Sequence, residues 1–188
     1  QVLLRDGSVI GAEALLRWRN SAGEFVPPPV VIGLIDRLGL RHRFNRWLFQ
    51  QAAQILHQLR MDGLEIDVSI NLSATDLYDA EVPDLIGQAL STWNLEAGRL
   101  CLEITETSVV RARTRTRRFI GRMRDLGCRV ALDDFAPGFC PFGYLRDLDV
   151  DYLKIDGSFV RDLDHSGLSE AVVRSITEIA HLLGKRAV

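Results

Sequence analysis

Short apolar runs recur along the chain, and each of them predicts a buried strand. The first runs from residue 9 to residue 16 and follows the turn signal Asp6-Gly7. Further strands are predicted at residues 68–72, 100–105, 128–132, 152–155 and 186–188. The runs are mostly apolar except at their carboxyl ends, which is typical of a sheet covered by helices.

Between these runs, apolar residues return at steps of three and four, the spacing of one helix face. The clearest stripe extends from Phe44 to Leu59, and Asp62-Gly63 ends it. Similar stripes predict helices at residues 82–93, 119–126 and 173–183. Three consecutive prolines at residues 27–29 break the chain and can start a short helix.

The alternation of strands and helices predicts βαβ units and an α/β fold with a parallel sheet. A doubly wound sheet and a TIM-type barrel both fit this order. The patterns GxGxxG and GxxxxGK[ST] are absent from the sequence, so the usual dinucleotide and P-loop signals are missing. Because barrel enzymes carry their chemistry at the carboxyl ends of several strands, the polar residues at those ends indicate the site.

Polar side chains end or interrupt the apolar strands at the same place on successive strands. They are Glu13, Asn71, Glu103, Asp133, Asp134, Lys154 and Asp156. In a parallel sheet these groups converge on one rim. Oxygen donors without His or Cys suit Mg²⁺, Mn²⁺ or Ca²⁺ rather than Zn²⁺.

Two features of this set point to its chemistry. The adjacent acids Asp133 and Asp134 could serve two metal ions, an arrangement that acts on phosphodiesters. Lys154 lies in an apolar strand and needs an anionic partner there. A single acid at a strand end could equally cap a helix, so the spacing supports a metal site and an ion-pair network alike.

Charge and cysteine usage narrow the function classes. The net charge of −2 does not predict an electrostatic nucleic-acid binder. Arginines crowd residues 111–124, which favours a solvated helix face and leaves phosphate-backbone binding as the alternative. Three unpatterned cysteines suit a reducing, cytoplasmic location, and Cys101 and Cys128 are expected to be buried.

Several blocks of residues resemble, in order, those of EAL domains. They are residues 13–18 (EALLRW), 71–73 (NLS), 103–107 (EITET), 133–135 (DDF) and 151–156 (DYLKID). The resemblance runs along essentially the whole chain, and residues 1–188 are identified as one partial domain of this family. It implies a TIM-like (β/α)8 barrel with one antiparallel strand, incomplete in this chain.

The resemblance also implies an activity, the hydrolysis of the bacterial second messenger cyclic di-GMP to linear pGpG. Mg²⁺ or Mn²⁺ in a two-metal site would support the reaction, and Ca²⁺ would inhibit it. The residues that resemble the metal ligands are Glu13, Asn71, Glu103 and Asp133, with Asp134 on the second metal.

Four further residues match the family's functional positions. Lys154 resembles the lysine that orients the attacking water, and Arg17 resembles the contact to the substrate phosphate, for which a guanidinium suits the geometry. Glu106 resembles the residue that holds the loop after Asp134. Asp156 resembles a further acid of the active rim.

The sequence departs from the family pattern in two segments. The loop that usually reads DFGTGYSSL is DFAPGFCPF at residues 134–142, where two prolines remove N–H donors. Residues 31–36 read VIGLID in place of FIPxAE. A glutamate-bearing AEGVE segment is expected after a strand like residues 186–188 and is absent, which predicts that this piece of a larger protein is inactive by itself.

The altered loop keeps a second function open, a degenerate domain that binds cyclic di-GMP or a partner protein without hydrolysis. The family resemblance further implies a homodimer, and sensory or cyclase-like domains elsewhere in the parent protein. The parent protein could be anchored to a membrane through a segment that this chain does not contain. No run in this chain approaches the ~20 apolar residues of a membrane span.

Overall fold

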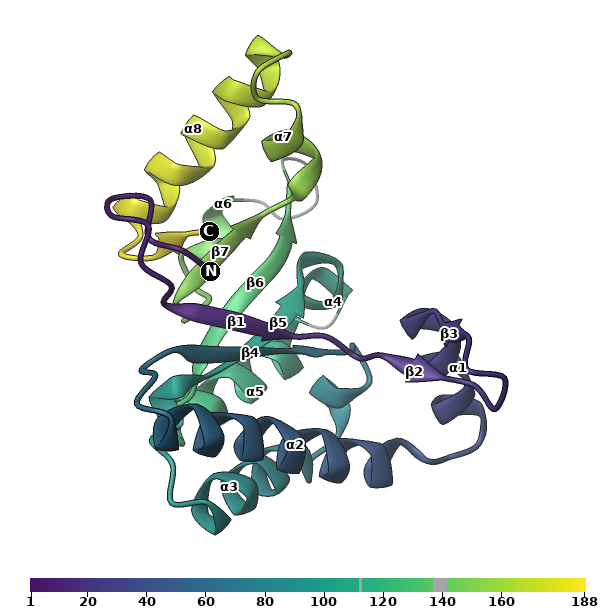
Figure 1. Ribbon diagram of the computed structural model, residues 1–188. Helices are drawn as coiled ribbons and strands as arrows, with labels where there is room; N and C mark the ends of the chain where they lie inside the picture. The colour runs from purple at the N-terminus through teal and green to yellow at the C-terminus, as the bar shows by residue number, and fades with distance from the viewer. Residues whose placement is uncertain (112, 137–141) are drawn as a thin grey trace.

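A computed structural model describes residues 1–111, 113–136 and 142–188 and contains one six-stranded parallel sheet (Figure 1). Its strands, in spatial order, are β1 (Gly11–Ala14), β4 (Asp67–Leu72), β5 (Leu100–Thr105), β6 (Arg129–Phe135), β7 (Tyr152–Ile155) and β8 (Arg186–Ala187). Each strand pairs in parallel with the next. The predicted α/β class and parallel sheet are therefore confirmed, and the sheet curls like half of a barrel.

The antiparallel strand that the resemblance implies is not among these six strands. In the described part of the chain, antiparallel pairing occurs in a small hairpin, β2 (Trp18–Arg19) with β3 (Phe25–Val26), and in a bridge between Val2 and Val9. The hairpin was not predicted. It explains why the first strand ends at Ala14 rather than at residue 16, because the chain then leaves the sheet toward β2 (Figure 1).

Helices connect the strands as the apolar stripes predict. The longer ones are α1 (Pro28–Arg37), α2 (Arg41–Met61), α3 (Val82–Thr92), α5 (Arg113–Asp125) and α8 (Gly167–Leu182). The shorter ones are η1 (Asp76–Tyr78), η2 (Ala97–Arg99), α4 (Glu106–Arg111), α6 (Phe142–Leu145) and α7 (Gly157–Arg161). No helix in the described residues combines the length and apolarity needed to cross a membrane.

The two faces of the sheet differ in chemistry because side chains alternate along each strand. One face of β4 to β7 packs against α2, α5 and α8 and is fully buried, as Ile70, Leu102, Leu132 and Leu153 show. The other face carries polar and small residues at alternate positions. They are Asp67, Ser69 and Asn71 of β4, Cys101 and Glu103 of β5, Arg129, Ala131 and Asp133 of β6, and Tyr152 and Lys154 of β7.

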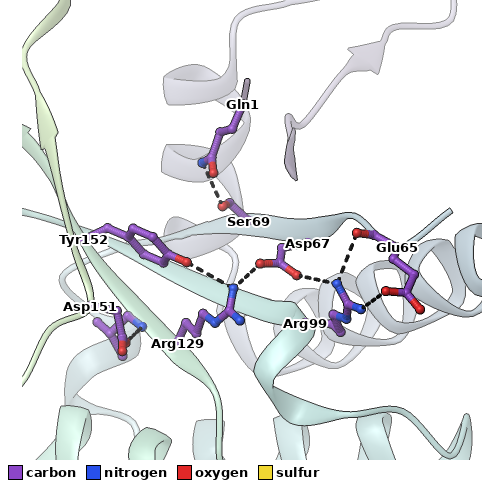
Figure 2. A network of polar contacts seen from close by, with 9 residues as sticks. Gln1, Glu65, Asp67, Ser69, Arg99, Arg129, Asp151 and Tyr152 are labelled. Atoms are coloured by element: carbon purple, nitrogen blue, oxygen red, sulfur yellow. Dashed lines mark hydrogen bonds and ion pairs between the residues drawn. The ribbon is translucent and has the colours of Figure 1, made fainter. Parts of the chain in front are cut away.

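The amino ends of the strands on this polar face are joined by a chain of charged contacts (Figure 2). Asp67 accepts hydrogen bonds from Arg129 and, at 3.3 Å, from Nη1 of Arg99. Arg129 also donates to the hydroxyl of Tyr152 at 3.0 Å, and Arg99 donates to the carboxylate of Glu65 at 3.1 Å. These contacts tie the starts of four neighbouring strands together, opposite the rim on which the predicted site lies.

Candidate functional site at the carboxyl ends of the strands

Lys154 is the centre of the polar rim. Its ammonium Nζ lies 2.5 Å from Oε2 of Glu103, 3.0 Å from Oδ1 of Asp133 and 3.6 Å from Oε2 of Glu13. The three acids come from β5, β6 and β1, and the lysine comes from β7. The prediction that Lys154 has an anionic partner is therefore confirmed, because three carboxylates lie around it. Strands far apart in the sequence bring their ends to one place.

Asn71 extends this group through β4. Its amide Nδ2 donates to Oε1 of Glu13 at 2.6 Å, while Oε2 of the same carboxylate faces Lys154. The pairing of Asn71 with Glu103 across β4 and β5 places both side chains at the same level of the sheet. Four of the five predicted ligands, Glu13, Asn71, Glu103 and Asp133, thus lie around one lysine.

Burial controls the ionisation of this cluster. The side chain of Glu103 is fully buried, which raises the pKa of its carboxyl, while the neighbouring Lys154 ammonium opposes that rise. For Lys154, burial by itself would lower the pKa, but hydrogen bonds and attraction from Glu103 and Asp133 outweigh it and raise the pKa. Lys154 is therefore a cation at neutral pH, able to donate protons in hydrogen bonds but not to act as a base.

Asp134 lies beside the cluster on an irregular backbone. The pairing of β6 with β7 shifts register between Leu132 and Phe135, and Asp134 has a φ of 53°, in the left-handed region. Burial and the charges of Asp133 and Asp156 raise the pKa of its carboxyl. Strained backbone of this kind is concentrated at functional sites. Among residues 1–111, 113–136 and 142–188, the carboxylate of Asp134 forms no ion pair, so it lies outside the Lys154 contacts.

Glu106 and Asp156 hold the backbone around this bulge. Glu106 is buried at the start of α4, and its Oε2 accepts a hydrogen bond from the N–H of Ala136 at 3.2 Å. Asp156 caps α7 by accepting from the N–H of Ser158 at 2.7 Å, and its own N–H donates to the carbonyl of Phe135 at 3.1 Å. Hydrogen bonding to the side chain and the backbone of Ser158 lowers the pKa of the Asp156 carboxyl. The expected changes at residues 137–141 of the loop lie outside the described residues.

Arg17 is not brought into the cluster. It lies in the exposed segment between β1 and β2, and its Nη1 donates to the neighbouring carbonyl of Leu16 at 2.9 Å. Within the described residues it makes no hydrogen bond or ion pair with the acids of the rim. The chain continues from there to β2 and β3, which lie beyond the carboxyl end of β1 (Figure 1).

The donor set fits a hard divalent cation in its chemistry. Carboxylate and amide oxygens are the ligands that Mg²⁺ and Mn²⁺ prefer, and Oε1 of the buried Glu103 has no hydrogen-bond partner among the described residues. In the described part of the chain, however, no three His, Cys, Asp or Glu side chains are grouped so as to enclose an ion. The acid oxygens instead face the Lys154 ammonium, so side-chain rotation would have to accompany metal binding.

The arginines of residues 113–124 are mostly engaged by their own chain. Arg113 and Arg115 stack over the rings of Tyr144 and Tyr78, each at 4.9 Å. Arg122 pairs with Asp84 at 2.7 Å, and Arg124 pairs with Asp149 and Asp151 at 2.7 and 2.9 Å. These contacts support the interpretation of α5 as a solvated helix face.

Comparison with known proteins identifies the family. The family described as EAL domain matches residues 1–188, which is the whole of the chain. The chain belongs to the EAL domain family. The blocks at the strand ends that resemble this family are the same ones that the fold gathers around Lys154.

Curated relatives of this EAL chain are named as enzymes. It is 32% identical over 185 residues to the cyclic di-GMP phosphodiesterase PA2567 of Pseudomonas aeruginosa, covering 98% of this chain and 32% of the relative. It is 33% identical over 186 residues to the cyclic di-GMP phosphodiesterase NbdA of the same organism, covering 98% of this chain and 24% of the relative. The chain thus spans a third or less of these relatives.

Solved EAL structures share the fold over almost the whole chain. A complex of the PaMucR phosphodiesterase with c-di-GMP superposes with a TM-score of 0.89 at 29% identity, covering 99% of this chain and 76% of that one. The FimX EAL domain from Pseudomonas aeruginosa bound to c-di-GMP gives a TM-score of 0.87 at 26% identity, covering 99% and 74%. These neighbours are EAL domains, whose fold is a TIM-like barrel, so the expected fold class is confirmed.

Proposed function

We propose that the protein containing this EAL chain hydrolyses cyclic di-GMP to linear pGpG with the help of Mg²⁺ or Mn²⁺. The observation that carries the proposal is the convergence of Glu13, Glu103 and Asp133 on Lys154, from four different strands. The names of the relatives and the cyclic di-GMP in the structures of the neighbours support the choice of substrate.

In this proposal the acids and Asn71 hold divalent metal at the rim. A bound divalent metal supplies a water-derived nucleophile at neutral pH and neutralises charge on the phosphodiester. Lys154 remains protonated and donates a hydrogen bond that orients the attacking water. Arg17 binds the substrate phosphate through its guanidinium, and Glu106 fixes the backbone after Asp134. Ca²⁺ is proposed to inhibit, because it tolerates looser coordination than Mg²⁺.

The test is turnover by the full-length protein and by variants of the rim. Asp133→Ala and Glu13→Ala are expected to lower kcat about 100-fold or more, since each removes a ligand of the proposed metal. Asp84→Ala is the matched control, because this exposed acid lies in α3 and, among the described residues, pairs with Arg122 and not with the rim. Wild-type activity in Asp133→Ala and Glu13→Ala, as expected for the control, would contradict the proposal.

Binding without turnover is a second candidate. It is favoured by the arrangement in which the ammonium of Lys154 engages the same oxygens that metal would need. Saturable binding of cyclic di-GMP with no pGpG formed, unaffected by Asp133→Ala, would support a receptor instead of an enzyme. The homodimer and the additional sensory domains stay predictions from the family resemblance.

A further inference from the structure

A buried hydrogen-bonded group lies directly behind the rim, beside the end of β4. Asp76 is 3% exposed and Asn45 is completely buried. Oδ1 of Asp76 accepts from Nδ2 of Asn45 at 2.8 Å, and Oδ2 accepts from both the N–H and the hydroxyl of Ser73, at 2.8 and 2.6 Å. A buried carboxylate is costly unless such bonds satisfy it, so all of these groups are held in one arrangement.

This group fixes the point at which the chain leaves β4. The N–H of Asp76 donates back to the carbonyl of Ser73 at 3.1 Å, so the turn from residue 73 to 76 is closed from both sides. Ser73 follows Asn71 by two residues. Asn71 is therefore held between this turn on one side and its hydrogen bond to Glu13 on the other.

The same group reaches the junction of α1 and α2. Arg41, at the start of α2, donates to Oδ1 of Asp36 at 2.8 and 2.5 Å, and its Nη1 lies 3.9 Å from Oδ2 of Asp76. Asp36 is in the last turn of α1, the helix that follows the β2–β3 hairpin. A single buried carboxylate thus links the end of β4 with the junction of α1 and α2.

We propose that Asp76, oriented by Asn45, is a positioning residue that sets Asn71 for metal binding at the rim. The inference rests on the proposed function for its metal, but it concerns a residue pair that touches neither metal nor substrate. Loss of hydrogen bonds that orient a metal ligand typically weakens metal affinity ~10- to 100-fold.

Oδ1 of Asn45 has no hydrogen-bond partner in the described structure, and this spare acceptor makes a reversal of the pair possible. Asn45→Asp alone sets a second carboxylate 2.8 Å from the first, where like charges repel. In the double variant Asn45→Asp/Asp76→Asn, the new amide at position 76 donates to the new carboxylate at position 45. Its oxygen still accepts from Ser73, so the turn is restored with the same total charge.

The experiment is a calorimetric titration of the full-length protein with Mn²⁺, without nucleotide, on these two variants and the wild type. We expect Mn²⁺ affinity to fall ~10-fold in Asn45→Asp and to return to within ~3-fold of wild type in the double variant. In turnover assays the Mn²⁺ concentration for half-maximal rate should rise in Asn45→Asp, while KM for cyclic di-GMP at saturating Mn²⁺ stays unchanged. A purely structural pair would leave the Mn²⁺ affinity of the folded fraction unchanged.

A milder pair of variants covers the case in which Asn45→Asp does not fold. Ser73→Ala removes the hydroxyl donor to Asp76 and should weaken Mn²⁺ binding ~3-fold, less than the ~10- to 100-fold of a full loss, because the N–H of residue 73 still donates to Asp76. Thr75→Ala is the control, because the Thr75 hydroxyl lies 2.7 Å from the same Ser73 hydroxyl but, among the described residues, forms no hydrogen bond with the Asp76 carboxylate; this variant should bind Mn²⁺ like wild type.

The outcomes separate this inference from the proposed function. Wild-type affinity in Asn45→Asp and Ser73→Ala, or a double variant no better than the single one, overturns the positioning role of Asp76. A wild-type protein that binds no Mn²⁺ and hydrolyses no cyclic di-GMP contradicts the proposed function itself, and the inference falls with it.

Discussion

Replacing Lys154 by methionine tests the ion cluster most severely. The side chain of Lys154 is 15% exposed, and its ammonium contacts three carboxylates at 2.5 to 3.6 Å. Lys154→Met leaves the fully buried Glu103 without a cation, and Oε1 of Glu103 already lacks a partner. Methionine largely retains the packing of the lysine methylenes. The destabilisation should therefore come mainly from the removal of the charge.

The magnitude follows from the geometry. A unit charge pair at ~3 Å is worth about 5 kcal/mol at an effective dielectric constant of 20, and desolvation offsets much of this. Breaking a buried pair by removing one partner typically costs about 3–5 kcal/mol, and we expect Lys154→Met to lower the free energy of unfolding by that amount. Urea unfolding at pH 7.5 with a chelator present measures it.

Lys185→Met is the matched control. Lys185 is 7% exposed, but within the described residues its ammonium donates to the carbonyls of Leu148 and Val150, at 2.7 and 3.1 Å, and pairs with no carboxylate; burial lowers its pKa. Since burial disfavours this charge, its loss should cost only about 2 kcal/mol, the net worth of two typical hydrogen bonds. If Lys154→Met is no more destabilising than Lys185→Met, the reasoning about the cluster is wrong.

Three further results are expected. Asp67→Asn should lower the free energy of unfolding, measured with urea, by about 2 kcal/mol, because two arginines lose a partly buried partner. The side chain of Glu65 in the same network is 87% exposed, so Glu65→Gln should cost under about 0.5 kcal/mol. Because the pKa of Lys185 is lowered by folding, the unfolded chain binds more protons than the folded chain between that lowered pKa and 10.5. The stability of the wild type relative to Lys185→Met should therefore rise with pH in this window, and a fall would contradict the prediction. Burial raises the pKa of the Cys101 and Cys128 thiols to about 12, so both should react with a thiol reagent only on unfolding, as peptide mapping would reveal.

Apolar periodicity predicted the main elements because strands and long helices bury one face each. The stripe from Phe44 to Leu59 lies within α2, and the run at residues 100–105 is β5. The hairpin of β2 and β3 escaped prediction because each strand has only two residues. Its turn depends on Asn20, whose side-chain oxygen accepts from two backbone N–H groups, and no apolar pattern reveals such a bond.

The rim was predictable because polar residues at the ends of parallel strands must meet. That argument brought together Glu13, Asn71, Glu103, Asp133 and Lys154, and the structure confirms their proximity. No local pattern indicated the pair Asn45 and Asp76, which are 31 positions apart on two helical segments. A hydrogen bond between distant segments depends on tertiary packing, which local spacing does not encode.

The central claim is that the acids around Lys154 serve metal-dependent hydrolysis of cyclic di-GMP. The most direct measurement incubates the full-length protein with cyclic di-GMP and Mg²⁺ and separates the products by chromatography. The account predicts pGpG as the product, suppression by Ca²⁺, and loss of product in Asp133→Ala. Intact nucleotide with the wild-type protein, at Mg²⁺ and Mn²⁺ concentrations that saturate binding, would contradict it.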